Sequence, residues 1–226
     1  EKIELSMQKY AFITSTGTNI GKTFLTAMLI KRAITLNHKV NALKPIISGF
    51  NINDLNETDT GIILDALKGS LNDIDKISPW RFNDPLSPDM AAKNEEKTIN
   101  FTDLVNFCIN NINNQNYDLT LIEGVGGTMV PINEKYTIMD LIIALNIPVI
   151  LTIGSYLGSI SHTLNAYKIL NKHNINVSSI VMMQSEINDV GCEATVNSLE
   201  NYIKNSPIIY FKRNDIDYLK VDKILN

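Results

Sequence analysis

Short, continuously apolar runs alternate along this chain with longer segments of helical periodicity. Residues 119–123 (LTLIE) and 149–153 (VILTI) stay apolar at successive positions instead of alternating apolar with polar residues. A strand with this pattern is covered on both of its faces, as in a parallel sheet between helices. Strands that alternate with helices at this spacing indicate βαβ units. We therefore predict an α/β fold with a mostly parallel sheet flanked by helices.

No linker rich in Pro or Gly divides the 226 residues, which predicts one domain over residues 1–226. Met7 could be the native start, which would make residues 1–6 a disordered extension or a non-native remnant. A Pro-containing segment at 78–88 is ambiguous and is expected to be a loop. The predicted strands cover residues 10–15, 40–44, 119–122, 148–153, 177–183 and 208–211. The predicted helices cover residues 22–37, 59–67, 102–112, 138–145, 160–172 and 192–203, with Phe24, Leu25, Met28 and Leu29 on the buried face of the first.

The charge balance limits the partners of the chain. Twenty Lys and Arg against 24 Asp and Glu give a net charge of −4, which offers no general attraction for nucleic acid or an anionic membrane. The longest apolar stretch, 138–157, is interrupted by Asp140, Asn146 and Pro148, so no membrane span is expected. The two cysteines and three histidines form no metal-binding pattern, and free thiols are typical of the cytoplasm. An anionic ligand must therefore be held by a local site.

Such a site is predicted between the first strand and the first helix, at residues 16–23 (TGTNIGKT). A Gly-Lys-Thr sequence that follows a strand and opens a helix is the setting of a phosphate-binding P-loop. In a P-loop, Lys22 would reach the β- and γ-phosphates and the Thr23 hydroxyl would bind Mg²⁺. The strict pattern has Gly where Thr16 stands, so the alternative is a chance Gly-Lys-Thr at an ordinary helix start. We predict a variant P-loop.

Two acidic residues and a second lysine follow predicted strands or begin a helix. Glu123 ends an apolar strand and opens residues 123–127 (EGVGG), so it could approach a P-loop Mg²⁺; the alternative is a strand-capping carboxylate beside turn glycines. Asp59 offers another oxygen ligand, or only a helix N-terminal charge. Lys44 precedes Pro45, which favours an extended backbone and a lysine projecting toward the loop; the alternative is an exposed lysine. Together these residues predict a nucleotide site with up to three Mg²⁺ ligands.

The order and spacing of these motifs resemble the ATP-dependent dethiobiotin synthetase family along nearly the whole chain. Its landmarks here are residues 16–23, 44–49 (KPIISG), Thr58-Asp59, Ser87-Pro88 before Ala91, 123–127, 148–151 (PVIL) and 154–162 (GSYLGSISH).

The resemblance implies a ligase of biotin biosynthesis, which uses ATP and Mg²⁺ to join CO₂ to 7,8-diaminopelargonate and close the ring of dethiobiotin. It implies Lys22 and Lys44 as catalytic residues, and Thr23, Asp59 and Glu123 as Mg²⁺ ligands. The implied nucleotide-binding residues are Asn19, Ile20, Gly21, Lys22, Thr23, Phe24, Asp59, Glu123, Gly124, Val125 and Gly126, and Gln184 is a further candidate. The implied substrate-binding residues are Lys44, Ser48, Leu157, Gly158, Ser159, Ile160 and Ser161.

The segment 157–161 resembles the one that binds the substrate carboxylate across a dimer interface in this family, which implies a homodimer. The alternative is a simple helix N-cap in which Ser159 or Ser161 bonds the backbone. The chain departs from the family where an Asn-Asp pair reads the base: residues 182–185 are MMQS, and Lys212-Arg213 replaces an Ile-Pro element. Gln184 could still offer a donor and an acceptor to a base edge. The base preference stays open, and Trp80 is expected to be a packing residue.

Three other classes compete with this interpretation. A P-loop switch ATPase of the partitioning or positioning kind would carry its signature lysine where Gly17 stands. An amidating synthase of cobalamin type would need a longer chain and a cysteine nucleophile. A non-catalytic nucleotide-binding module would show no ATP turnover that depends on diaminopelargonate.

Overall fold

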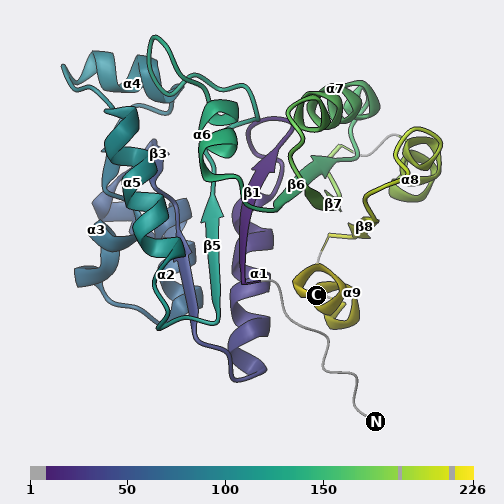
Figure 1. Ribbon diagram of the computed structural model, residues 1–226, viewed down its shortest axis with the longest axis horizontal. Coiled ribbons are helices and arrows are strands. Elements are labelled where there is room, and N and C mark those ends of the chain that lie inside the picture. Colours follow the sequence, from purple (N-terminus) through teal and green to yellow (C-terminus); the bar gives the residue numbers. More distant parts are fainter. Residues whose placement is uncertain (1–8, 188–189, 214–216) are drawn as a thin grey trace.

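A parallel sheet forms the centre of the molecule. The computed structural model describes residues 9–187, 190–213 and 217–226. In this part the main sheet has six strands in the order β2-β5-β1-β6-β7-β8, and every neighbouring pair is parallel. Figure 1 shows β1 between β5 and β6. The strands are β1 Tyr10–Ser15, β2 Val40–Leu43, β5 Leu119–Glu123, β6 Val149–Gly154, β7 Val177–Met183 and β8 Ile208–Phe211.

Helices cover both faces of this sheet, as the continuously apolar strands predict. One face packs against α1 (Lys22–Thr35), α2 (Asp59–Leu67), α3 (Ile74–Ile77) and α9 (Tyr218–Leu225). The other packs against α5 (Phe101–Ile112), α6 (Ile138–Leu145), α7 (Ser159–Lys172) and α8 (Cys192–Glu200). A short α4 (Pro88–Asn94) and two 3₁₀ turns, Ile52–Glu57 and Leu71–Asp73, lie in the connections. The predicted α/β fold with a mostly parallel sheet flanked by helices is confirmed.

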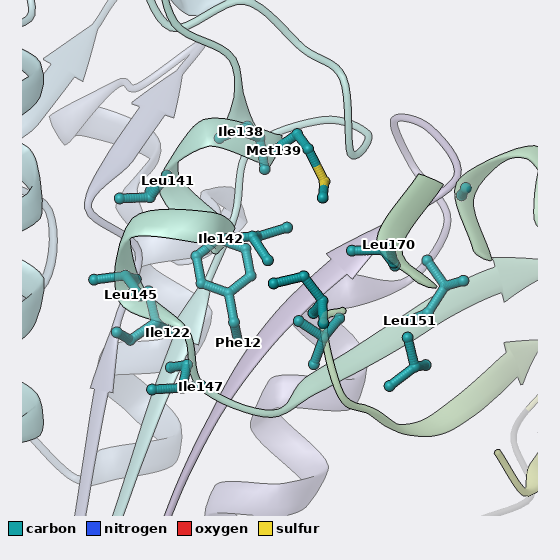
Figure 2. Close-up of a cluster of buried hydrophobic side chains, with 14 of the residues drawn as sticks. Phe12, Ile122, Ile138, Met139, Leu141, Ile142, Leu145, Ile147, Leu151 and Leu170 are labelled. Atoms are coloured by element: carbon teal, nitrogen blue, oxygen red, sulfur yellow. The ribbon is translucent and has the colours of Figure 1, made fainter. Parts of the chain in front are cut away.

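Successive residues of β1 point into the two cores. Ala11 and Ile13 belong to the cluster that contains α1, whereas Phe12 belongs to the cluster on the opposite face. Figure 2 shows Phe12 pointing from β1 toward α6, beside Ile142, with Ile122 of β5 and Leu151 of β6 nearby. The alternating direction of side chains along a strand accounts for this division.

Several predicted boundaries are one to three residues off. The helix predicted over 22–37 ends at Thr35, and Asn37 has a left-handed φ of 64°. The helix predicted over 192–203 ends at Glu200. The strand predicted over 40–44 ends at Leu43, because the backbone N–H of Lys44 donates to Ile77 O (3.0 Å). Phe24, expected on a buried helix face, is 48% exposed.

A second, two-stranded sheet was not predicted, and one of its strands lies in a segment that was expected to be a loop. Strand β3 (Ile46–Ser48) pairs in parallel with β4 (Trp80–Phe82) inside the ambiguous segment 78–88. Trp80 packs edge-on against the ring of Phe107, with ring centroids 5.7 Å apart, which confirms the packing role expected for it. Three-residue strands whose partners lie more than 30 positions away carry no local sequence signal.

Helices α3, α4 and α9 were not predicted either. Residues 1–6, predicted as an extension, lie outside the described residues. Within the described residues, no helix has the length and apolar character needed to cross a membrane.

Candidate active site

The predicted phosphate loop lies at the carboxyl end of β1, the third strand of the sheet order, and leads directly into α1. Gly21 is the N-cap of α1 with a φ of 95°, and a Cβ placed there would lie 3.0 Å from Met183 Cγ, so both backbone and space favour glycine. No side chain of the described residues caps this helix start. The N–H groups of the first turn are therefore available to an anion.

Lys22, the first residue of α1, folds back onto the loop. Its ammonium donates to Ser15 Oγ (3.0 Å) and to Gly17 O (3.3 Å), and the residue is buried. Burial, followed by the positive charge of Lys44, lowers the pKa of Lys22 to about 8. A negatively charged phosphate at the loop would favour the protonated lysine.

Thr23, Asp59 and Glu123 converge beside the loop. Thr23 Oγ1 lies 2.7 Å from Asp59 Oδ1 and 2.7 Å from Glu123 Oε1. Asp59 is the first residue of α2, whose N-cap Thr58 accepts from Gly61 N (3.1 Å), and Glu123 is the last residue of β5. One hydroxyl carries one proton and can donate to only one of the two carboxylates. The hydroxyl of Thr23 and the carboxylates of Asp59 and Glu123 thus bring three oxygens together around a single hydroxyl proton. Such a group of hard oxygen ligands suits a cation such as Mg²⁺.

The same two carboxylates hold Lys44, which follows β2. Its ammonium lies 2.8 Å from Asp59 Oδ2, 2.8 Å from Glu123 Oε1 and 3.0 Å from Gly124 O, so all three protons have acceptors. The side chain is only 2% exposed, so the alternative of an exposed lysine is wrong. Burial alone would lower the pKa of Lys44, but the charges of Glu123 and Asp59 outweigh it and raise the pKa.

The carboxyl group of Asp59 responds in the opposite sense. Burial alone would raise the pKa of Asp59, but the charge of Lys44, together with hydrogen bonds from Lys44 and Thr23, lowers it. Asp59 therefore stays ionised and contacts both Thr23 and Lys44. Its contacts go beyond those of a simple helix N-terminal charge.

The second oxygen of Glu123 contacts a residue that sequence reasoning missed. Thr26 Oγ1 lies 2.6 Å from Glu123 Oε2 and 2.9 Å from the backbone oxygen of Lys22. Both Thr26 and Glu123 are fully buried. The signal was helical spacing, because Thr26 follows Lys22 by four positions and Thr23 by three and so shares their face of α1.

The Gly-rich segment after Glu123 packs against the phosphate loop. A Cβ at Gly127 would lie 3.2 Å from Gly17 N and 3.3 Å from Thr16 C, so a side chain there would crowd the backbone of the phosphate loop and glycine is favoured. Thr128 N donates to Ser15 O (3.0 Å) and extends the contact. These glycines serve the contact between two loops as well as the turn.

The side chains of Lys22, Thr23, Lys44 and Asp59 line a cavity of about 650 Å³. Its other walls come from β3, which carries Ser48, and from residues 85–88 after β4, so the small second sheet closes the site. Glu123 and Gly124 do not belong to its lining and lie behind it, in contact with Lys44. The predicted site residues in the lining are Asn19, Ile20, Gly21, Lys22, Thr23, Phe24, Lys44, Ser48, Asp59, Val125 and Gly126.

Two predicted groups lie elsewhere in the described chain. Gln184, just beyond β7, accepts from Arg213 N through Oε1 (2.9 Å) and lines a separate cavity of about 500 Å³ with Tyr210 and Lys212. Residues 157–161 do not line the first cavity of their own chain. Gly158 is the N-cap of α7, and no serine side chain caps this helix in the described structure, so the N-cap alternative is wrong.

The chain is similar to known proteins along most of its length. The profile of a family described as AAA domain matches residues 9–209. The ATP-dependent dethiobiotin synthetase BioD of Acidiphilium cryptum (strain JF-5) is 42% identical over 87% of this chain and 89% of that protein. The enzyme of the same description from Caulobacter sp. (strain K31) is 34% identical over 90% and 88%, and the one from Legionella pneumophila (strain Paris) is 33% identical over 88% and 90%.

Solved structures show the wider fold. A chain of the MinC:MinD cell division protein complex from Aquifex aeolicus superposes with a TM-score of 0.59, covering 96% of this chain and 86% of that chain at 15% identity. A ParA family ATPase from Chlorobium tepidum TLS gives 0.53, with 96% and 89% covered at 13% identity. At these identities the positioning and partitioning ATPases share the fold alone. The chain has a P-loop NTPase fold and belongs to the ATP-dependent dethiobiotin synthetase family.

Proposed function

We propose that this chain is an ATP-dependent ligase that forms dethiobiotin, ADP and phosphate from 7,8-diaminopelargonate, CO₂ and ATP. The observation that carries the proposal is the meeting of Lys22, Lys44, Thr23 and Asp59 on one 650 Å³ cavity, with Glu123 directly behind it. Both reactants of the phosphoryl-transfer step are anions, and two lysines at one site offset their repulsion.

The reaction has three bond-forming steps. One amine of the substrate adds to CO₂ and loses a proton, which gives a carbamate. A carbamate oxygen then attacks the γ-phosphorus and ADP leaves, which gives a mixed carbamic-phosphoric anhydride. The second amine attacks the carbamoyl carbon and loses a proton, the bond from that carbon to the phosphate oxygen breaks, phosphate leaves, and the cyclic urea is complete.

The two lysines have different tasks in this sequence. Lys22 turns from Ser15 Oγ to the β- and γ-phosphates and stabilises the charge that develops as ADP leaves. Lys44, together with Ser48 in the same cavity, holds the carbamate. Ser48 Oγ is buried and has no hydrogen-bond partner within the described chain, which suits a side chain that meets its partner on the substrate.

Mg²⁺ is part of the proposal, with Thr23, Asp59 and Glu123 as its ligands. Bound there with ATP, it supplies positive charge to the phosphate oxygens. Within the described residues, no group of three or more His, Cys, Asp or Glu side chains could hold a metal ion. The proposed site therefore combines two carboxylates and a hydroxyl with the oxygens of the nucleotide, an arrangement that Mg²⁺ favours.

The proposal includes a cytoplasmic homodimer. The segment 157–161, which does not line the cavity of its own chain, would bind the substrate carboxylate in the partner subunit. Leu157 is 77% exposed, and α7 begins beyond it without a side-chain cap in the described structure, which leaves backbone N–H groups for a carboxylate. Cys108 and Cys192 are free, as is usual in a reducing compartment.

Contact between Gln184 and the base also belongs to the proposal. Because Oε1 of Gln184 accepts from the backbone N–H of Arg213, the NH₂ group is the part of the amide that would donate to a ring acceptor.

The decisive experiment incubates the full chain with Mg²⁺, bicarbonate, 7,8-diaminopelargonate and each nucleoside triphosphate in turn. Dethiobiotin is detected by mass spectrometry and the nucleoside diphosphate by chromatography. We expect dethiobiotin in an amount equal to the diphosphate, and none without the diamine. Triphosphate hydrolysis at the same rate with and without the diamine would refute the proposal and favour a switch ATPase. Nucleotide binding without turnover would also refute it and favour a binding module.

A further inference from the structure

We propose that Thr26 is a positioning residue that sets the affinity of the site for its metal ion by orienting the carboxylate of Glu123. The inference rests on the proposed function in one respect, since it takes Glu123 as a ligand of the metal that accompanies the nucleotide. It concerns a residue behind the cavity, because Thr26 is not in the lining and is fully buried.

The two oxygens of Glu123 have different surroundings. Oε1 contacts Thr23 Oγ1 (2.7 Å) and Lys44 Nζ (2.8 Å), and both of these groups also contact Asp59. Oε1 therefore faces the second carboxylate, where a cation would be shared. Oε2 contacts Thr26 Oγ1 (2.6 Å), and no other hydrogen bond to this oxygen occurs within the described residues.

The hydroxyl proton of Thr26 has two acceptors within reach, Glu123 Oε2 (2.6 Å) and Lys22 O (2.9 Å). Lys22 O lies four residues earlier on α1, so it already accepts the helical hydrogen bond from the backbone N–H of Thr26. Glu123 Oε2 belongs to a charged carboxylate and is the nearer of the two oxygens to Thr26 Oγ1, so it is the stronger acceptor. The proton therefore goes to Glu123.

A bound cation would change the contacts of Glu123 with Thr23 and Lys44, but not its contact with Thr26. Thr23 would turn a lone pair toward the cation, and Lys44 would meet a second positive charge beside the same carboxylates. Thr26 lies on the opposite oxygen and keeps its hydrogen bond in either state. It holds the plane of the carboxylate so that Oε1 stays directed at Thr23 and Asp59, as partners behind metal ligands commonly do.

The test compares Thr26→Val, which removes the hydroxyl at nearly constant volume, with Thr26→Ser, which keeps it. The control is Thr35→Val on the same helix. Thr35 Oγ1 makes the same bond to the oxygen four residues back, Lys31 O (2.8 Å), and has no hydrogen bond to a carboxylate of the described residues. Binding of Mn²⁺ in the presence of ADP is followed by electron paramagnetic resonance, and the Mg²⁺ dependence of turnover is measured alongside.

We expect Thr26→Val to weaken Mn²⁺ binding about tenfold or more, the range typical of partners behind metal ligands. Thr26→Ser and Thr35→Val should stay within about threefold of the parent chain. The turnover of Thr26→Val should recover at high Mg²⁺, whereas a purely structural defect would not. In a Glu123→Gln background, Thr26→Val should add little to the loss already present.

Parent-like Mn²⁺ binding by Thr26→Val, or an equal loss in Thr26→Ser, would overturn the proposal. If Thr26→Val does not fold, Thr26→Cys replaces it, since a thiol is a weaker donor of similar size and should also weaken binding. The metal measurement contains no diamine. A chain that binds Mn²⁺ and ADP but makes no dethiobiotin would refute the proposed function and still decide the role of Thr26.

Discussion

At the scale of single residues, Lys22 and Lys44 are both buried but differ in their partners. Within the described residues, the Lys22 ammonium donates to two neutral oxygens, of Ser15 at the end of β1 and of Gly17 in the phosphate loop, whereas Lys44 contacts two carboxylates. We expect Lys22→Ala and Lys44→Ala each to lower turnover by about two to three decades, or about 3–4 kcal/mol of transition-state stabilisation. Steady-state kinetics with circular dichroism as a folding check would measure this.

The matched control for these variants is Lys31→Ala. Lys31 lies on α1 as well, but its side chain is 59% exposed and pairs with Asp65 at the surface. Near-normal turnover of Lys22→Ala or Lys44→Ala would remove that lysine from the mechanism. A loss as large in Lys31→Ala would point to general damage to the helix.

Glu123 is expected to be the residue whose neutralisation most affects the metal. Glu123→Gln keeps the size of the side chain but removes its charge next to Asp59 and Lys44. The Mg²⁺ concentration for half-maximal turnover should rise by at least about tenfold. Asp65→Asn, an exposed change on α2, serves as the control. An unchanged Mg²⁺ dependence would make Glu123 a strand-capping residue only.

At the scale of elements, β1 connects the core to the site. The Phe12 side chain is fully buried and points toward α6 (Figure 2). A Cβ on Gly124, which follows Glu123, would lie 3.0 Å from the Phe12 ring. Phe12→Ala should lower the free energy of unfolding by about 3–5 kcal/mol, because it leaves a cavity between sheet and helix. Urea denaturation would measure the change. The control is Tyr202→Ala, since the Tyr202 residue is 66% exposed. Equal stability of the two variants would contradict this account of the core.

Elements also differ in how well a sequence predicts them. The central strands β1 and β7 and the helices α2 and α6 were predicted at the residues where they occur, because each combines an apolar pattern with a clear start and stop. Strand β3 was missed because its three residues pair with a strand far along the chain. The C-terminal α9 was missed although Asp217 caps it. The equally short α6 (IMDLIIAL) is almost wholly apolar, whereas α9 (YLKVDKIL) has three charged residues between its apolar ones, so its apolar pattern is weaker.

The site divides in the same way. Lys22, Thr23 and Glu123 could be predicted because they end or follow strands that are parallel, and such strand ends meet at one edge. Helical spacing places Thr26 on the same face of α1 as Lys22 and Thr23, but its partner could not be predicted, because only the packing of α1 against β5 selects Glu123. The contact of Gln184 with Arg213 also depends on two segments that are distant in sequence.

At the scale of the whole molecule, the sheet and its helices keep Cys108 of α5 away from water. Burial raises the pKa of the Cys108 thiol to about 12. At pH 8 this thiol should resist modification by thiol reagents in the folded chain and react in denaturant, as mass spectrometry of digested peptides can show. Modification of Cys108 under native conditions would contradict the burial.

The same shift has a consequence for stability. The unfolded thiol loses its proton near pH 9 while the folded one keeps it to about pH 12, so the unfolded state binds fewer protons between these values. The contribution of Cys108 to stability is therefore complete below pH 9 and decreases as the pH rises above it. Cys108→Ala should reduce this dependence, as denaturation at pH 8 and pH 10 would measure.

The burial of Lys44 also bears on how the chain folds. Its ammonium is compensated only when β5 has brought Glu123 beside β2 and α2 has brought Asp59, residues that lie 79 and 15 positions away in sequence. A partly folded chain that enclosed the lysine without them would contain an unpaired charge, at a cost of several kcal/mol. Such intermediates are disfavoured. The pairing of β2 with β5 and the meeting of Lys44, Glu123 and Asp59 should therefore occur in one cooperative step. A chain in which these strands have paired would then already contain this part of the site.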